Sequence, residues 1–276
     1  MDHYKNIPII DADGPATDLS HPKDAAFGCV PRDYEEYPEA MFAQPDGMKL
    51  IEPSDWDAYY DKDEETKSSL EHVFLGGPDG KPRFVNLDQG QFGDCWCFST
   101  GHSIMVNRLA QNLPIVRLNP SAVATMLKRP DMGGWCGLSA QFARDNGYPV
   151  EGTGPGQWPL QSHDMRYDTA ESRELMTHHK ITEDWVDLTK QVYNRNLTER
   201  QLATCLFNNY ACPVDFNWWG HSVCALRMVR ISRGEWGLLI LNSWKGWGRY
   251  GLAVLRGNQR IPNGAVCVRS VTTSRL

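Results

Sequence analysis

The sequence lacks the features that would place it in a membrane or on a nucleic acid. It has no run of about 18 apolar residues, the shortest that spans a bilayer as a helix. Its start, "MDHYKNIPIIDADGP", lacks the basic flank and apolar core of a signal peptide. It also has no basic stripe interleaved with aromatic residues. We therefore expect a soluble, cytoplasmic protein with neither membrane nor nucleic acid as a partner.

Cysteine is not dense enough for a disulfide scaffold. The eight cysteines are scattered singly over 276 residues, unlike the framework of small secreted domains, so we expect most of them to be reduced. Cys95 and Cys97 have no second close Cys/His pair at zinc-finger spacing. We therefore expect no metal site and no cofactor.

Basic residues are scarce in the N-terminal quarter. Residues 1–65 hold 17 Asp/Glu against 5 Lys/Arg, a net charge of −12, whereas the rest of the chain carries 17 against 23, a net of +6. Seven of the 17 prolines also lie there, which argues against long helices. We define residues 1–65 as the acidic arm. Composition leaves two alternatives open: a solvated, partly disordered tail, or an arm that lies across its own domain or docks on a partner.

Residues 66–276 read as one α+β domain, helical over about 83–190 and sheet-rich over about 191–276. Helix periodicity and capping signals are found in the first part, and β-branched and aromatic runs in the second. His178 and His179 are expected on the solvated face of their helix. The predicted helices cover 95–111, 135–147, 169–179 and 198–209, and the predicted strands 212–219, 221–231 and 235–244.

The stretch "DQGQFGDCWCFST", residues 88–100, places a thiol at a helix start. Asp94 can cap a helix that begins at Cys95, where unpaired backbone N–H groups favour a thiolate. His221 opens one strand of a predicted hairpin and Asn242 closes the other, so an imidazole and an amide can meet there. Such a histidine can take the proton of the thiol, while Gln89 could donate to an oxyanion.

Three of these segments resemble the motifs of papain-like cysteine peptidases. Residues 89–99, "QGQFGDCWCFS", are similar to their nucleophile segment, "GHSV" at 220–223 to their histidine segment, and "NSWKGWGRYG" at 242–251 to their asparagine segment, one residue shorter here. The order of cysteine, histidine and asparagine agrees. The resemblance covers roughly residues 83–272 and implies two lobes, one mainly helical and one sheet-rich, with a cleft between them.

The resemblance also implies roles for individual residues. Cys95 would be the nucleophile, His221 the base and then the acid, Asn242 the group that orients the imidazole, and Gln89 the oxyanion donor. The remaining positions would support or bind the substrate: Gly133 and Gly134 line the cleft, Gly220 precedes the histidine, Trp244 shields the His–Asn contact and Trp247 shapes the leaving-group side. Plain core packing remains the alternative for both tryptophans.

Departures from the family pattern matter as well. Phe92 and Asp131 stand where a disulfide would be expected, and the loss of both cysteines fits a reducing compartment. The charge of Asp94 would oppose thiolate formation. The arm lacks the helical spacing of the usual inhibitory propeptide, and residues 57–85 would be an insertion on the outer face of the helical lobe.

The sequence thus predicts a cysteine endopeptidase that acts on peptide or protein substrates. A structural alternative is a phage or virion assembly protein that uses the same scaffold with weak or no activity. The overall sequence resembles bacterial and phage members of the family more closely than lysosomal ones, which raises this alternative. In that case it would be found in the virion. The arm would then dock on a capsid or tail protein, whereas in a peptidase it could cover the cleft and inhibit it.

Overall fold

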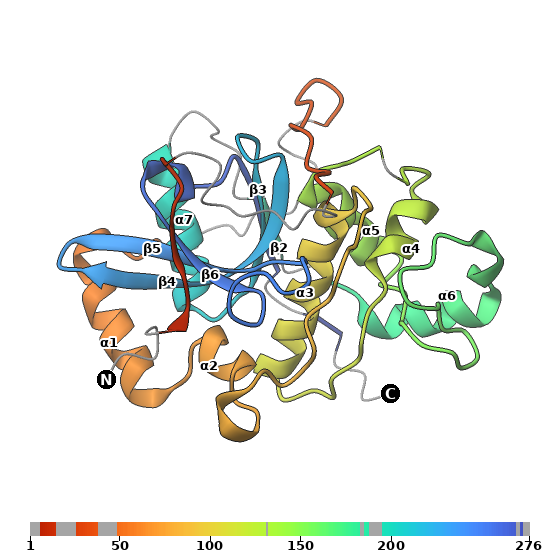
Figure 1. Cartoon of the computed structure of the whole chain (residues 1–276), viewed down its shortest axis with the longest axis horizontal. Coiled ribbons are helices and arrows are strands. Elements are labelled where there is room, and N and C mark those ends of the chain that lie inside the picture. The colour runs from red at the N-terminus through yellow and green to blue at the C-terminus, as the bar shows by residue number, and fades with distance from the viewer. Residues whose placement is uncertain are drawn as a thin grey trace.

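The chain folds into a helical lobe and a sheet-rich lobe that lie side by side (Figure 1). The computed structural model describes residues 6–14, 26–37, 49–130, 132–182, 185–187, 195–268 and 271–272. The α-helices are α1 Trp56–Thr66, α2 Leu70–Phe74, α3 Cys95–Ala110, α4 Pro120–Met126, α5 Cys136–Asp145, α6 Ala170–Met176 and α7 Arg195–Phe207, and the strands are β1 Ile9–Asp11, β2 Trp185–Asp187, β3 Cys212–Phe216, β4 His221–Ser232, β5 Glu235–Leu241, β6 Leu252–Arg256 and β7 Gly264–Val268.

One sheet forms the second lobe, with the strand order β1-β6-β5-β4-β3-β7-β2. All the pairings are antiparallel except that of β1 with β6. Successive side chains of a strand point to opposite faces, and both faces of this sheet are buried. On β4, Cys224 and Leu226 join the hydrophobic cluster around α3, whereas Val223 and Ala225 join the cluster on the far side, with α7.

Helix α3 is the central element between the lobes. It packs against β3 and β4 on one side and against α4 and α5 on the other. Its residues from Cys95 to Leu109 are all buried, so its polar side chains need partners inside the protein. The Asn107 amide donates to the carbonyl of Val268 and accepts from the N–H of Ala211. Gly101 lets α3 approach its neighbours, because a Cβ there would lie 3.1 Å from the ring of Pro120.

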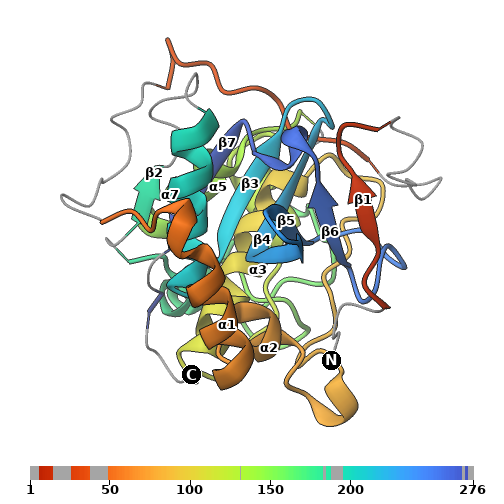
Figure 2. The same cartoon turned by 90° about the vertical axis from the view of Figure 1, so that its left-hand side faces the viewer.

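Helix α1 corrects the prediction that the prolines of the acidic arm exclude a long helix. Pro53, the last of them, begins a short 3-10 turn directly before α1, where its missing N–H costs nothing. Helix α1 packs on the sheet lobe (Figure 2), because Trp56 and Tyr60 belong to its hydrophobic cluster. The expectation of an insertion on the helical lobe is therefore wrong for this helix.

The acidic residues of α1 pair with arginines of the sheet. Arg230 on β4 contacts Asp57 and Asp61 at 2.9 and 2.6 Å. Arg227, which is buried, reaches Glu64 at 2.7 Å. This part of the arm lies across a basic surface of its own domain, which was one of the two alternatives that the composition left open.

Two further expectations differ from the structure. The helix predicted over 198–209 is α7, which begins earlier, at Arg195, and ends at Phe207. His179 is buried rather than solvated. Burial and the charge of Arg108 lower the pKa of His179 to about 3, so its imidazole is neutral.

Candidate active site

Cys95 is the first residue of α3 and is fully buried. Burial raises the pKa of its thiol to about 12. The backbone N–H groups of Ser222 and Gly28 lower this pKa by donating to the sulfur, while the charge of Asp215 raises it. The expected lowering at a helix start is therefore wrong for this arrangement of the chain, because desolvation outweighs the helix N-terminus.

His221 and Asn242 meet as the hairpin predicted. His221 Nε2 lies 2.7 Å from Asn242 Oδ1, and both residues are fully buried. The same Oδ1 accepts from the backbone N–H of Ser243 at 2.7 Å, which fixes the orientation of the amide. A proton taken from the thiol must then go to the other ring nitrogen, Nδ1.

Aromatic rings enclose this histidine. Trp244 stacks on the imidazole with ring centroids 4.1 Å apart, and Trp219 meets its edge at 4.8 Å. Trp247 packs against Trp244 in turn, at 6.4 Å. These rings exclude water from the His–Asn contact, which strengthens it. Trp219 was missed at the sequence level, although it stands only two positions before His221.

Gln89 lies at the same site and is held in place by the asparagine segment. Its N–H donates to the carbonyl of Ser243, and its Oε1 accepts from the hydroxyl of Ser243. Its Nε2 donates to the carbonyl oxygens of Phe92 and Ala26, both at 2.9 Å. The amide of Gln89 is therefore oriented as a donor, and one carbonyl that it binds belongs to the acidic arm.

Asp94 precedes Cys95, but its side chain does not cap α3. Its Oδ2 lies 2.7 Å from His163 Nε2, so the capping expectation is wrong and the carboxylate is paired with an imidazole instead. The ring of Phe92 packs on His163 at 4.3 Å, and Asp131, its expected partner position in the family disulfide, lies outside the described residues. His163 was missed because nothing in the local sequence connects it to Asp94, 69 positions away.

The glycine pair borders the cleft and binds backbone. Gly133 has a φ of +72°, which favours glycine. Gly134 has no space for a side chain, because a Cβ would lie 2.6 Å from the ring of Trp96. Its N–H donates to the carbonyl of Gly28 at 2.8 Å, and its carbonyl accepts from Val30 at 2.9 Å.

We call residues 26–30 the cleft segment of the arm, because they lie between the two lobes. Cys29 forms a β-bridge with Gly134 of the helical lobe, and its N–H donates to Gly220 of the sheet lobe at 3.0 Å. A Cβ on Gly28 would lie 1.9 Å from the carbonyl oxygen of Gly93. The segment therefore fits so closely that only glycine is accommodated at this position.

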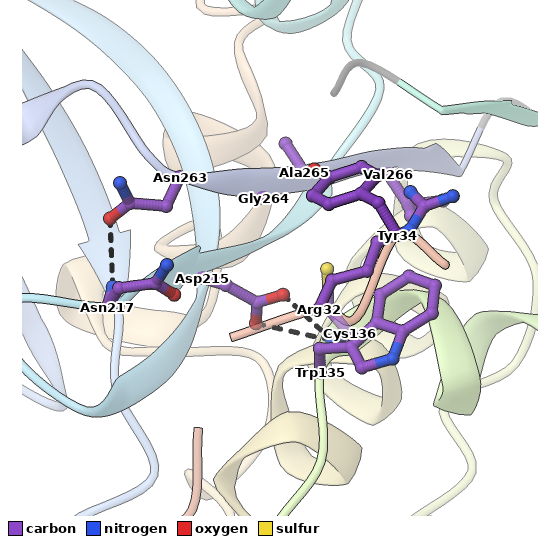
Figure 3. Close-up of a pocket in the computed structure, with 10 residues that line it drawn as sticks. All are labelled: Arg32, Tyr34, Trp135, Cys136, Asp215, Asn217, Asn263, Gly264, Ala265 and Val266. Carbon is purple, nitrogen blue, oxygen red and sulfur yellow. Dashed lines mark hydrogen bonds between the residues drawn. The ribbon is translucent and has the colours of Figure 1, made fainter. Parts of the chain in front are cut away.

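Asp215 on β3 is a buried carboxylate that sequence analysis did not single out. Figure 3 shows it facing Cys136 of α5, whose N–H donates to it at 3.0 Å across the two lobes. Burial raises the pKa of this carboxyl, while hydrogen bonds from Ser222 and Cys29 lower it. It borders a cavity of about 50 Å³ that is also lined by Trp135.

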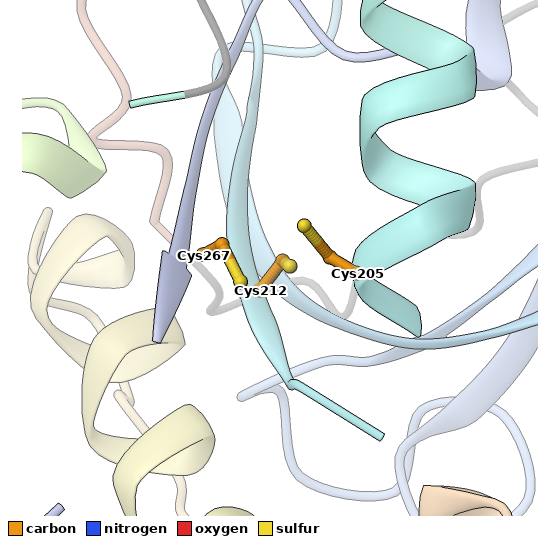
Figure 4. A group of neighbouring side chains, drawn as sticks. All are labelled: Cys205, Cys212 and Cys267. Carbon is orange, nitrogen blue, oxygen red and sulfur yellow. The ribbon is translucent and has the colours of Figure 1, made fainter. Parts of the chain in front are cut away.

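Three thiols gather in the core of the sheet lobe (Figure 4). The sulfur atoms of Cys205, Cys212 and Cys267 all lie within 4.8 Å of one another, and the three residues are fully buried. Sulfur ligands suit soft metal ions, but only as thiolates. Burial raises the pKa of the Cys212 thiol well above its usual value, and the two neighbouring thiols raise it further. Among the described residues the cluster has three ligands, one fewer than the four of a structural zinc site.

Comparison with known proteins identifies the architecture. No protein-family model matches the sequence, and no curated protein matches it. Solved structures do match. A mite allergen structure from work on Blo t 1 and Der p 1 has a TM-score of 0.56 at 13% identity, over 85% of this chain and 75% of that one. Xylellain, a cysteine protease from Xylella fastidiosa, has a TM-score of 0.55 at 15% identity, over 93% of this chain and 99% of that one.

The chain has the papain-like fold. Digestive procathepsin L 3 of Tenebrio molitor larval midgut also matches, with a TM-score of 0.50 at 17% identity, over 79% of this chain and 88% of that one. The chain spans 62% of the length of the proform of Amb a 11, a ragweed pollen cysteine protease. The predicted α+β fold class is thus confirmed. No helix of the described residues is long and apolar enough to cross a membrane.

Proposed function

We propose that the chain is a cysteine peptidase that hydrolyses peptide bonds through Cys95, His221 and Asn242. The observation that carries this proposal is the 2.7 Å contact between His221 Nε2 and Asn242 Oδ1, because it fixes the imidazole in one tautomer. The thiol lies beside the backbone N–H of Ser222, the next residue after the histidine, which lowers its pKa by hydrogen bonding.

The proposed reaction has two halves. His221 Nδ1 takes the proton of the thiol, and the sulfur attacks the peptide carbonyl carbon. Gln89 Nε2 and the backbone N–H of Cys95 stabilise the oxyanion that forms. The imidazolium then gives its proton to the leaving amine as the C–N bond breaks. Water, deprotonated by the same imidazole, hydrolyses the resulting thioester and releases the acid.

The acidic arm is proposed to hold this site in a covered state. The cleft segment supplies the carbonyl of Ala26 to Gln89, so it occupies the donor that the reaction needs. It also keeps Cys95 buried, and at neutral pH a thiol with a pKa of about 12 is almost wholly protonated. Withdrawal of the segment would admit water, lower the pKa and open the cleft.

Cleavage of an unfolded protein tests the proposed activity. In the Gly28→Ala variant the cleft no longer accommodates the cleft segment, so this variant should fragment unfolded casein. The double variant Gly28→Ala/Cys95→Ala should not. Mass spectrometry of the products gives the cleavage sites. If both variants leave the substrate intact while remaining folded, the assembly-protein alternative is preferred.

A further inference from the structure

A groove with a volume of about 600 Å³ opens between residues 81–88 and 245–251. Its size is that of sites that bind small molecules or a few side chains. Phe84 and Trp247 are nearly buried and form an apolar floor, whereas Val85 and Tyr250 are 79% and 43% exposed at its walls. Exposed apolar side chains gathered around a hollow indicate a binding surface.

The rim of this groove is basic. Lys81, Arg83 and Lys245 line it, and all three are exposed. Among the described residues that line the groove, Asp88 is the only carboxylate, which gives these residues a net charge of +2. Within the parts of the chain that the structure describes, no carboxylate forms an ion pair with these three cations. The charge of the rim therefore complements an acidic ligand.

Two lining residues of the groove adjoin residues of the candidate active site. Asp88 directly precedes Gln89, and Asn86 in the groove wall donates to the backbone carbonyl of Asn242 at 2.6 Å. The cleft segment runs from Gly134, which pairs with Cys29, to Gln89, which binds Ala26.

The cleft segment does not line this groove, because the described residues that line the groove all belong to 81–88 and 245–251. We propose that the groove binds part of the peptide substrate and selects segments in which acidic residues flank an apolar one. The apolar side chain lies on Trp247 and Phe84, and its acidic neighbours face Lys81 and Lys245. This inference rests on the proposed peptidase function, because the bound peptide is a substrate only if the protein cleaves it. Binding of the peptide to the groove does not itself depend on catalysis.

Binding to the Cys95→Ala protein tests the groove separately from the chemistry. Two labelled twelve-residue peptides are compared by fluorescence anisotropy, one with glutamates around a leucine and one with lysines in their place. The acidic peptide should bind at least about ten-fold more tightly at low salt, and added salt should reduce the difference. Equal affinity for the two peptides would overturn the inference.

Charge reversal locates the binding. Lys81→Glu/Lys245→Glu should invert the preference between the two peptides, whereas Lys62→Glu, an exposed reversal on α1, should leave it unchanged. An unchanged preference in the double variant rules out this groove. Self-association in the ultracentrifuge that the acidic peptide displaces would assign the groove to a second copy of the chain instead. If the acidic peptide binds but Gly28→Ala cuts nothing, the peptidase function fails and the acidic recognition stands.

Discussion

Gln89 Nε2 donates to the carbonyl oxygen of Ala26 at 2.9 Å, so the proposed oxyanion donor is bound by the chain itself. The partner carbonyl comes from the acidic arm, 63 positions earlier in the sequence. The same arm segment bonds to both lobes, through Gly134 and Gly220. The structure is therefore that of a covered site.

Gly28→Ala is expected to activate the protein. The new Cβ would lie 1.9 Å from the carbonyl oxygen of Gly93, so the cleft segment has to leave its place. Hydrolysis of a quenched fluorescent peptide should accelerate by about ten-fold or more. A change of about 1.4 kcal/mol in the free energy difference between the covered and the open cleft changes the ratio of their populations ten-fold. Gly154→Ala is the matched control, because Gly154 is exposed and a Cβ there would approach only the flexible side chain of Gln157, at 3.1 Å. A rate that does not change in Gly28→Ala would refute the inhibitory role of the arm.

Alkylation of Cys95 should depend on both pH and the arm. With a pKa of about 12, the thiol of the intact chain should react slowly with iodoacetamide at pH 7 and progressively faster toward pH 11. Because the pKa of the Cys95 thiol is raised in the folded state, this thiol makes its full contribution to the free energy of unfolding below about pH 8.5. The contribution decreases as the pH rises above that value. Cys224, whose pKa burial also raises to about 12, is the internal reference. In Gly28→Ala the reaction of Cys95 at pH 7 should increase while that of Cys224 does not, and a parallel increase would indicate general unfolding.

Asn242→Ala should reduce kcat by about ten- to a hundred-fold with little change in KM, because the lost contact orients the base and does not bind the substrate. Steady-state kinetics in the Gly28→Ala background measures this. Asn196→Ala, an exposed change on α7, is the control. A change confined to KM would assign Asn242 to substrate binding instead.

His163→Ala should destabilise the fold, because it removes the 2.7 Å contact to the Asp94 side chain, which is fully buried. Removal of one partner that leaves a buried polar group without its hydrogen bond costs about 1–3 kcal/mol. Urea denaturation gives the value. The double variant His163→Ala/Asp94→Asn should recover part of the loss, and if it is as unstable as the single variant, packing of His163 rather than charge accounts for the effect.

The motifs predicted the fold well because they lie in regular elements. Cys95 begins a buried helix, His221 begins β4 and Asn242 directly follows β5, so local pattern and register were sufficient to bring the last two together. The starts of α3, α5, β4 and β5 were predicted to within one residue, whereas α5 ends at Asp145, before Gly147, and β5 ends at Leu241, three residues before the predicted end.

Contacts between distant loops could not be predicted from local sequence patterns. The pairing of Asp94 with His163 and the position of Asp215 depend on packing between segments that share no local signal. The cleft segment was foreseen only as one alternative for an acidic arm. Its hydrogen bonds are made by backbone groups, which carry no sequence signature.

The most direct test of the proposed function is covalent labelling by a peptide vinyl sulfone, read by intact-protein mass spectrometry and peptide mapping. In Gly28→Ala we expect one adduct, located at Cys95, which forms much faster than the adduct of free cysteine. His221→Ala should abolish this advantage, because the imidazole is needed to deprotonate the thiol. A Cys95 that reacts no faster than free cysteine, or whose rate does not change in His221→Ala, would contradict the proposal that this papain-like fold carries an active peptidase site.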